Sequence, residues 1–166
     1  MRAEFDAQKM AVMRDSSLPE EIDRLSSEII GVAMEVHSHL GPGLREKTYE
    51  NALVVELRRR GVAVAQQVPF HVFYKGDDLG LQVIDVVVAS VVIVECKSCA
   101  ALAERDGSRL YGYLRFANLP LGLLINFNVA RLKEGITRKV NWPLQPTSCA
   151  VSITSNSHFD FSALPS

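Results

Sequence analysis

The spacing of apolar residues changes along the chain from a helical period to the alternation of β-strands. A helix is predicted between a capping box at 17–20 and the turn LGPG at 40–43, because apolar residues recur there at helical spacing. A second amphipathic helix is predicted over 44–60, with Gly61 as its C-terminal stop. From Val62 onward the pattern predicts strands instead.

The remainder of the chain predicts a sheet with one further helix. Strands are predicted over 62–67, 69–74, 81–88, 91–97, 121–127 and 135–140, and a helix over 102–117. This order is typical of an α/β domain built on a mixed sheet. We therefore expect one domain over 17–141, a flexible N-terminal arm over 1–16 and a polar, poorly ordered C-terminal tail over 142–166.

Composition narrows the class of protein without fixing its function. Of 166 residues, 48% are apolar and 22% are charged, which is ordinary for a globular domain, and no apolar run is long enough to span a membrane. Acidic residues near the N-terminus argue against a secretory signal, and three cysteines make no disulfide framework, so we expect a cytoplasmic protein. The net charge of −1 argues against a sequence-independent coat for DNA.

The charge is unevenly distributed along the sequence. Residues 1–90 carry a net charge of −4, and residues 91–141 carry a net charge of +4. A basic second half could face phosphates while acids elsewhere gather a metal ion. On charge alone, a solvated surface with a chance asymmetry is the simpler explanation.

Two charges interrupt the most apolar strand of the chain. The stretch VVIVECKS at 91–98 begins with four β-branched residues, which indicates a strand covered on both faces. Because side chains alternate along a strand, Glu95 and Lys97 share one face and Cys96 takes the other. Charge is costly in a core strand, so the pair predicts either a functional site or an ion pair that holds two strands in register.

Asp85 is the predicted partner of this pair, because it interrupts the apolar run VIDVVV. A three-residue hairpin loop at 89–91 would place Asp85 opposite Glu95, whereas a two-residue loop would place it opposite Val94 and turn Glu95 away. Two carboxylates on one face repel each other unless a cation lies between them. All-oxygen ligands favour Mg²⁺ or Mn²⁺, and Lys97 could orient a water for phosphodiester hydrolysis.

These residues belong to longer motifs. Ile84-Asp85 followed by Val94-Glu95-Cys96-Lys97, after an acidic helix, resembles the PD-(D/E)XK nuclease superfamily. The stretch GLREKTY at 43–49 matches the motif of the GxxExxY family, and the likeness covers about residues 25–141. It extends through EVHSHLGPG (35–43), VPFHVFYKG (68–76) and LGLLINFNVARLKEGI (121–136). The resemblance implies a restriction-endonuclease-like α/β fold, with a mixed β-sheet flanked by helices.

The resemblance also implies a site. Asp85 and Glu95 would bind Mg²⁺ or Mn²⁺ together with the backbone carbonyl of Cys96. Glu46 on the second helix would add a carboxylate to the metal site. Lys97 would position or activate the attacking water. Tyr49 would pack behind Glu46 rather than act.

Three basic residues are candidates for phosphate contact. Arg131 and Lys133 follow a core strand in a loop, where functional groups tend to be displayed. Family members usually carry H-x-x-Q ahead of a Tyr-Leu pair, whereas this chain has Asp106 and Arg109 in those positions. Arg109 would bind a phosphate more tightly than glutamine, but the same change is also expected of a site that has drifted away from catalysis.

Three hypotheses about function follow. The leading one is a metal-dependent nuclease that acts on nucleic acid, DNA more than RNA, without membrane association and with a homodimer as one form of assembly. The second is a nuclease-like fold retained as a module that binds nucleic acid or protein. The third treats Glu95 and Lys97 as a plain ion pair within the strand.

Overall fold

Two helices, a five-stranded sheet and a third long helix make up the described part of the chain. The computed structural model describes residues 18–144, so the predicted arm over 1–16 and most of the predicted tail over 142–166 lie outside the described residues. The elements are α2 Glu20–Leu40, α3 Glu46–Arg59, β1 Val64–Tyr74, β2 Asp77–Val88, β3 Val92–Lys97, α4 Glu104–Ala117, β4 Leu121–Asn126, the 3-10 helix η1 Leu132–Gly135 and β5 Ile136–Val140. None of these helices is long and apolar enough to cross a membrane.

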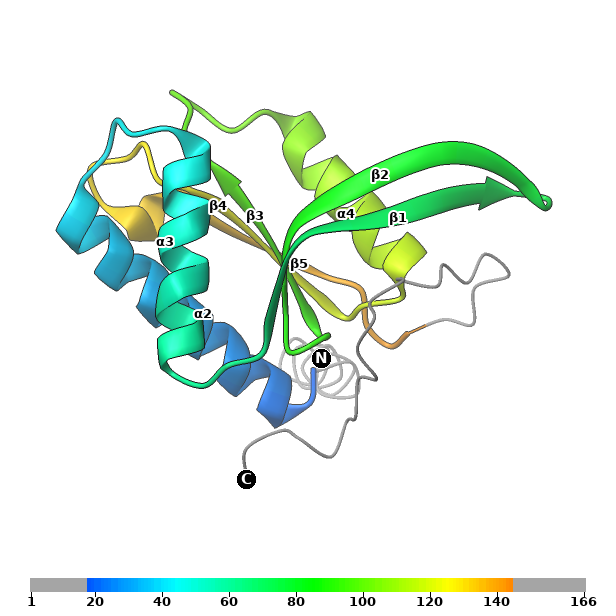
Figure 1. Cartoon of the computed structure of the whole chain (residues 1–166), viewed down its shortest axis with the longest axis horizontal. Helices are drawn as coiled ribbons and strands as arrows, with labels where there is room; N and C mark the ends of the chain where they lie inside the picture. The colour runs from blue at the N-terminus through cyan, green and yellow to red at the C-terminus, as the bar shows by residue number, and fades with distance from the viewer. Residues whose placement is uncertain (1–17, 145–166) are drawn as a thin grey trace, which may run out of the picture.

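The strands form one mixed sheet in the order β1-β2-β3-β4-β5. Strands β3 and β4 are parallel, and the other neighbours are antiparallel. Parallel neighbours need a crossover connection, and α4 provides it. Figure 1 shows α2 and α3 on one side of the sheet and α4 on the other. The predicted restriction-endonuclease-like architecture, a mixed sheet flanked by helices, is therefore confirmed.

Each face of the sheet has its own hydrophobic core. The larger core packs apolar side chains of α2 and α3 against one face of the central strands, and Cys96 belongs to it. The smaller core packs Leu110 and Leu114 of α4 against Ile93 and Leu124 on the other face. Cys96 therefore lies on the opposite face from the α4 side of β3, as the alternation of side chains predicted.

The β1–β2 hairpin bends sharply where the site begins. The two strands predicted over 62–67 and 69–74 are one strand, β1, because Pro69 is tolerated on the edge of the sheet. Side-chain alternation breaks between Val86, which belongs to the α2–α3 core, and Ile84, which belongs to the α4 core. The strand therefore twists at Asp85, so that side chains on either side of this residue change the face on which they pack. The outer half of the hairpin projects beyond the rest of the sheet in Figure 1.

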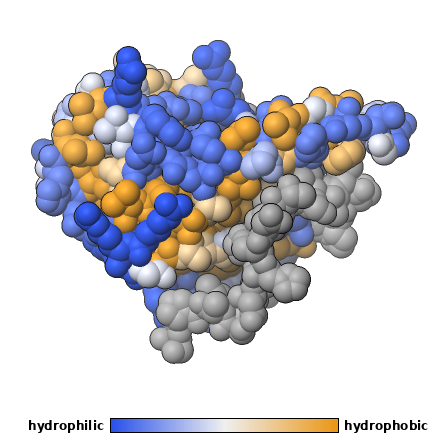
Figure 2. Space-filling model, viewed as in Figure 1, coloured by the Kyte–Doolittle hydropathy of each residue, from blue (hydrophilic) through white to orange (hydrophobic). Residues whose placement is uncertain are grey.

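The projecting part of the hairpin is partly apolar. Figure 2 shows hydrophobic surface interrupting the polar surface along this arm. Its large exposed apolar side chains are Phe73, Tyr74, Leu79, Leu81 and Val83. Val68, Phe70 and Ile84, nearer the bend, are buried against the α4 side. The base of the hairpin is thus fixed by the core, and the predicted site residue Asp85 lies at this base.

Gly122 on β4 faces Leu110 of α4 with no room for a side chain between them. A Cβ at position 122 would lie 2.8 Å from Leu110 Cδ1. Gly122→Ala should therefore lower the free energy of unfolding by about 1–3 kcal/mol, because Leu110 must leave its packed position. Urea unfolding followed by circular dichroism measures this change.

Gly112→Ala is the matched control on α4, since nothing lies within 4 Å of a Cβ there. It should leave stability unchanged or raise it by up to about 1 kcal/mol, as alanine is the better helix former. Equal losses in the two variants would contradict the close packing of α4 on β4.

Candidate active site

The hairpin between β2 and β3 has the three-residue loop that the chemistry required. Val86 pairs with Val94 across the loop 89–91, so Asp85 faces Glu95 in the same register. The backbone N–H of Asp85 donates to Glu95 Oε1 at 3.4 Å. The predicted register is confirmed, and the two carboxylates meet on the α4 side of the sheet.

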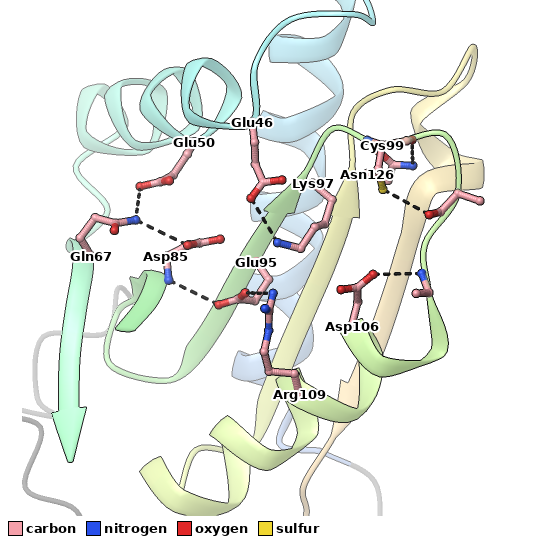
Figure 3. A network of polar contacts seen from close by, with 12 residues as sticks. Glu46, Glu50, Gln67, Asp85, Glu95, Lys97, Cys99, Asp106, Arg109 and Asn126 are labelled. Carbon is pink, nitrogen blue, oxygen red and sulfur yellow. Dashed lines mark hydrogen bonds and ion pairs between the residues drawn. The ribbon is translucent and has the colours of Figure 1, made fainter. Parts of the chain in front are cut away.

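Two basic side chains from different elements lie beside these acids, and each pairs with a different carboxylate (Figure 3). Arg109 Nη2 on α4 lies 3.4 Å from Glu95 Oε2, and Lys97 Nζ donates to Glu46 Oε1 at 3.1 Å. Within residues 18–144, Glu95 and Lys97 form no ion pair with each other. The hypothesis of a plain ion pair between them is therefore wrong, because each finds its partner on a helix.

One carboxylate oxygen of Asp85 is an unsatisfied acceptor. This atom, Oδ2, is buried and has no hydrogen-bond partner among the described residues. Burial and the charge of Glu50 raise the pKa of the Asp85 carboxyl, and the charge of Lys97 and the backbone N–H of Cys96 act against them. A buried acceptor without a donor costs free energy, so a cation at this position would remove a real penalty.

Glu95 is the most perturbed acid of the site. Only 3% of the residue is exposed. Burial and the charge of Asp85 raise its pKa to about 7, although the Asp85 N–H, Arg109 and Lys97 oppose the shift. Such a shift is what two neighbouring carboxylates in a dry site produce, and it is frequent at functional sites.

Lys97 remains an ammonium ion. Burial lowers its pKa, but the hydrogen bond to Glu46 and the charges of Glu46 and Glu95 outweigh that effect, so the pKa is raised. A raised pKa makes Lys97 a poor base. It is suited instead to holding a water molecule and to offsetting negative charge on a phosphate.

Tyr49 fixes the turn that presents Glu46, the first residue of α3. Its hydroxyl donates to the carbonyl of Gly41 at 2.6 Å and accepts from the backbone N–H of Leu44 at 3.0 Å. Its fully buried ring stacks on Phe127 at a centroid distance of 4.6 Å. Tyr49 is therefore a core residue that supports the turn before Glu46.

The chain after Lys97 is fastened at both sides. Ser98 Oγ donates to the carbonyl of Leu44 at 2.6 Å, which ties the end of β3 to the turn before α3. Asn126, buried at the end of β4, accepts from the backbone N–H of Cys99 at 3.1 Å and donates to its carbonyl at 2.9 Å. These contacts hold the backbone of Lys97 in place.

Asp106 and Arg109, the two departures from the family pattern, have different roles. Asp106 Oδ2 accepts the backbone N–H of Ala103 at 2.9 Å, so it stabilises the first turn of α4. Arg109 lies one turn further on and reaches Glu95. Asp106 is thus explained by the first turn of α4, which it stabilises, and Arg109 belongs to the site.

The side chain of Cys96 takes no part in the site. It is fully buried in the α2–α3 core, and burial raises the pKa of its thiol well above the usual range. The predicted ligand at this position is the backbone carbonyl, and that assignment stays a prediction.

Arg131 and Lys133 are not brought together with the acids. Both are exposed beside and within η1, the 3-10 helix that packs on α2. His37 of α2 contacts the carbonyl of Val129 at 2.9 Å and so holds the start of this segment. Within the described chain, neither Arg131 nor Lys133 forms an ion pair with an acidic residue.

Glu50 is a buried acid of the site that the sequence analysis missed. It lies one turn after Glu46 on α3 and is 3% exposed. Its Oε1 atom accepts from Lys47 Nζ at 2.7 Å, Gln66 Nε2 at 2.7 Å and Gln67 Nε2 at 3.0 Å. The spacing of Glu46 and Glu50 puts both on one side of the helix and could have indicated it.

The donor set fits a hard divalent cation held by few protein ligands. No group of three or more His, Cys, Asp or Glu side chains in residues 18–144 is arranged to hold a metal ion. Glu46 is engaged by Lys97, and Glu50 by Lys47 and two glutamines. Mg²⁺, however, keeps several waters and is commonly bound by one or two carboxylates, which Asp85 and Glu95 can supply.

Comparison with known proteins identifies the family. The model of the PD-(D/E)XK nuclease superfamily matches residues 23–139, which is well over half of the chain. The chain therefore belongs to the PD-(D/E)XK nuclease superfamily, whose nucleases generally use divalent metal ions. Searches among curated proteins and among solved structures found no significant match.

Glu95→Gln should change how stability depends on pH. Because the pKa of Glu95 is about 7 when folded and 4.5 ordinarily, the folded state binds this proton more tightly than the unfolded state. The contribution of this proton to the free energy of unfolding is fully present below pH 4.5 and is lost as the pH rises through 7. This contribution is about 3 kcal/mol.

Urea unfolding of the metal-free wild type and the variant at pH 4 and pH 8 measures this contribution. The free energy of unfolding of the wild type minus that of Glu95→Gln should be smaller at pH 8 than at pH 4. A stability difference between the two proteins that does not change with pH would contradict the buried, proton-binding carboxyl.

Proposed function

We propose that this protein is a metal-dependent nuclease of the GxxExxY family that hydrolyses phosphodiester bonds of nucleic acid. One observation carries the proposal: Asp85 and Glu95 face each other beside Lys97, and one oxygen of Asp85 is buried without a hydrogen-bond partner among the described residues. The superfamily supports the same reaction class.

The carboxylates of Asp85 and Glu95 and the backbone carbonyl of Cys96 would hold Mg²⁺ or Mn²⁺. The ion would supply Lewis-acid stabilisation of the charge that develops on the phosphate. Glu46 is the proposed additional carboxylate, and it already holds Lys97 in place at 3.1 Å. Proton loss from Glu95 must accompany binding at neutral pH, because its pKa is about 7.

Lys97 and Arg109 supply the positive charges of the reaction. The ammonium of Lys97, held by Glu46, would orient the attacking water and offset charge on the phosphate. The guanidinium of Arg109 would leave Glu95 and clamp a phosphate oxygen. Arg131 and Lys133, both exposed, would contact the nucleic-acid backbone further from the cut.

The proposal extends to the partner and its setting. We expect DNA rather than RNA as the substrate, a cytoplasmic location and assembly as a homodimer. The proposed reaction does not depend on any of these three expectations.

A catalytically drifted module that binds nucleic acid or protein is the second candidate. The contact between Arg109 and Glu95 favours it, because a guanidinium already compensates one of the two carboxylates. In this case Lys97→Ala would leave binding unaffected and there would be no turnover to lose.

Lys97→Ala should abolish cleavage while leaving the protein folded. Removing the charge that orients the water and faces the phosphate should lower the cleavage rate by on the order of 100-fold or more. End-labelled single- and double-stranded DNA and RNA are incubated with the protein and Mg²⁺ or Mn²⁺, and with EDTA as the metal-free control. Wild type should cut DNA only when metal is present.

Lys75→Ala, at the tip of the hairpin arm, is the matched control and should cut at the wild-type rate. Thermal unfolding checks that both variants are folded. If the wild type cuts no substrate with either metal, or if Lys97→Ala cuts as fast as wild type, the nuclease proposal fails. Metal-independent binding by both proteins would then favour the binding module.

A further inference from the structure

We propose that Glu50 is a positioning residue for Asp85 and that it acts through the side-chain amide of Gln67. Neither residue carries a role in the reaction proposed above, and both come from elements outside the strand pair that bears the acids. The expected effect on metal binding rests on the proposed function, whereas the contact itself is testable in metal-free protein.

Gln67 occupies the bend of β1 directly opposite Asp85. The pairs on either side are Gln66 with Val86 and Val68 with Ile84, so Asp85 is its cross-strand neighbour. Its φ angle is 53°, in the left-handed region that residues other than glycine seldom adopt. Such a conformation is kept only where the surroundings determine it, and it is frequent at functional sites.

The amide of Gln67 bridges two carboxylates, as Figure 3 shows. Its Nε2 atom donates to Glu50 Oε1 at 3.0 Å and to Asp85 Oδ1 at 3.5 Å. An amide nitrogen carries two hydrogens, so it can make both contacts at once. The shorter contact identifies Glu50 as the anchor and Asp85 as the group that is oriented.

Glu50 is suited to be that anchor. It is almost fully buried, and its Oε1 is fixed by Lys47 and by Gln66, each at 2.7 Å. Gln67 is an exposed residue, so without Glu50 its side-chain amide would change rotamer freely and hydrogen-bond to solvent. A rigid buried carboxylate therefore determines where an otherwise mobile amide donates.

The consequence lies in the two oxygens of Asp85. Gln67 engages Oδ1, while Oδ2 is buried and has no partner within residues 18–144. Holding one oxygen fixes the plane of the carboxylate and leaves the other to face a cation. Groups that orient a metal ligand in this way typically change metal affinity by roughly 10- to 100-fold when removed.

The test is calorimetric titration of Mn²⁺ into wild type, Glu50→Gln and Gln67→Gly. Glycine adopts a φ of 53° without strain, so Gln67→Gly removes the amide and keeps the bend. Both variants should raise the Kd for Mn²⁺ by roughly 10- to 100-fold. Glu56→Gln, on the same helix and paired with Arg60, is the matched control and should bind as wild type does.

A metal-free readout separates the two proposals. The side-chain amide resonance of Gln67 in a ¹⁵N–¹H spectrum should move in both Glu50→Gln and Asp85→Asn, and stay in place in Glu56→Gln. If wild type binds Mn²⁺ and Gln67→Gly binds it equally well while its melting temperature is unchanged, the positioning role is overturned.

If wild type binds no Mn²⁺, the proposed function fails and the spectrum alone decides the positioning role. Movement of the Gln67 resonance in both variants supports it, and an unmoved resonance overturns it. Should Glu50→Gln fail to fold, Gln67→Gly carries the titration, and the Gln67 resonance in Asp85→Asn carries the spectroscopic test.

Discussion

Burial of two facing carboxylates at the bend of a core hairpin is the constraint on which this site depends. Asp85 and Glu95 repel each other, and burial deprives both of the water that would screen them. The sheet contributes the ammonium of Lys97, the side-chain amide of Gln67 and backbone N–H groups as compensation. The guanidinium of Arg109 comes from α4, and Lys97 is itself held by Glu46 at the start of α3, so both helices must be held in place relative to β3.

The residues around the acids serve this purpose. Tyr49 pins the turn before Glu46, Ser98 joins that turn to the end of β3, and Asp106 holds the start of the helix that carries Arg109. The G-x-x-E-x-x-Y motif thus combines one group that touches the site with residues that fix where it points. The glutamate of the motif lies in the site, and the glycine and the tyrosine shape the turn that positions it.

Much of this arrangement could be predicted from the sequence, because side chains alternate without interruption along β3. A carboxylate pair on one face permitted only the three-residue loop, and the loop is present. Pro69 misled the prediction of two separate strands, since an edge strand tolerates proline. Gln67 was missed because its position depends on a left-handed residue at the bend of β1, which leaves no periodic signal. Glu50 was missed although its spacing from Glu46 on α3 indicated it.

The central claim is that Asp85 and Glu95 together bind a divalent cation. Calorimetric titration of Mn²⁺ and Mg²⁺ into wild type and into the Asp85→Asn/Glu95→Gln double variant tests it most directly. The account predicts saturable binding by the wild type and none by the double variant, with both proteins folded. Equal binding by both proteins, or no binding by the wild type, would contradict it.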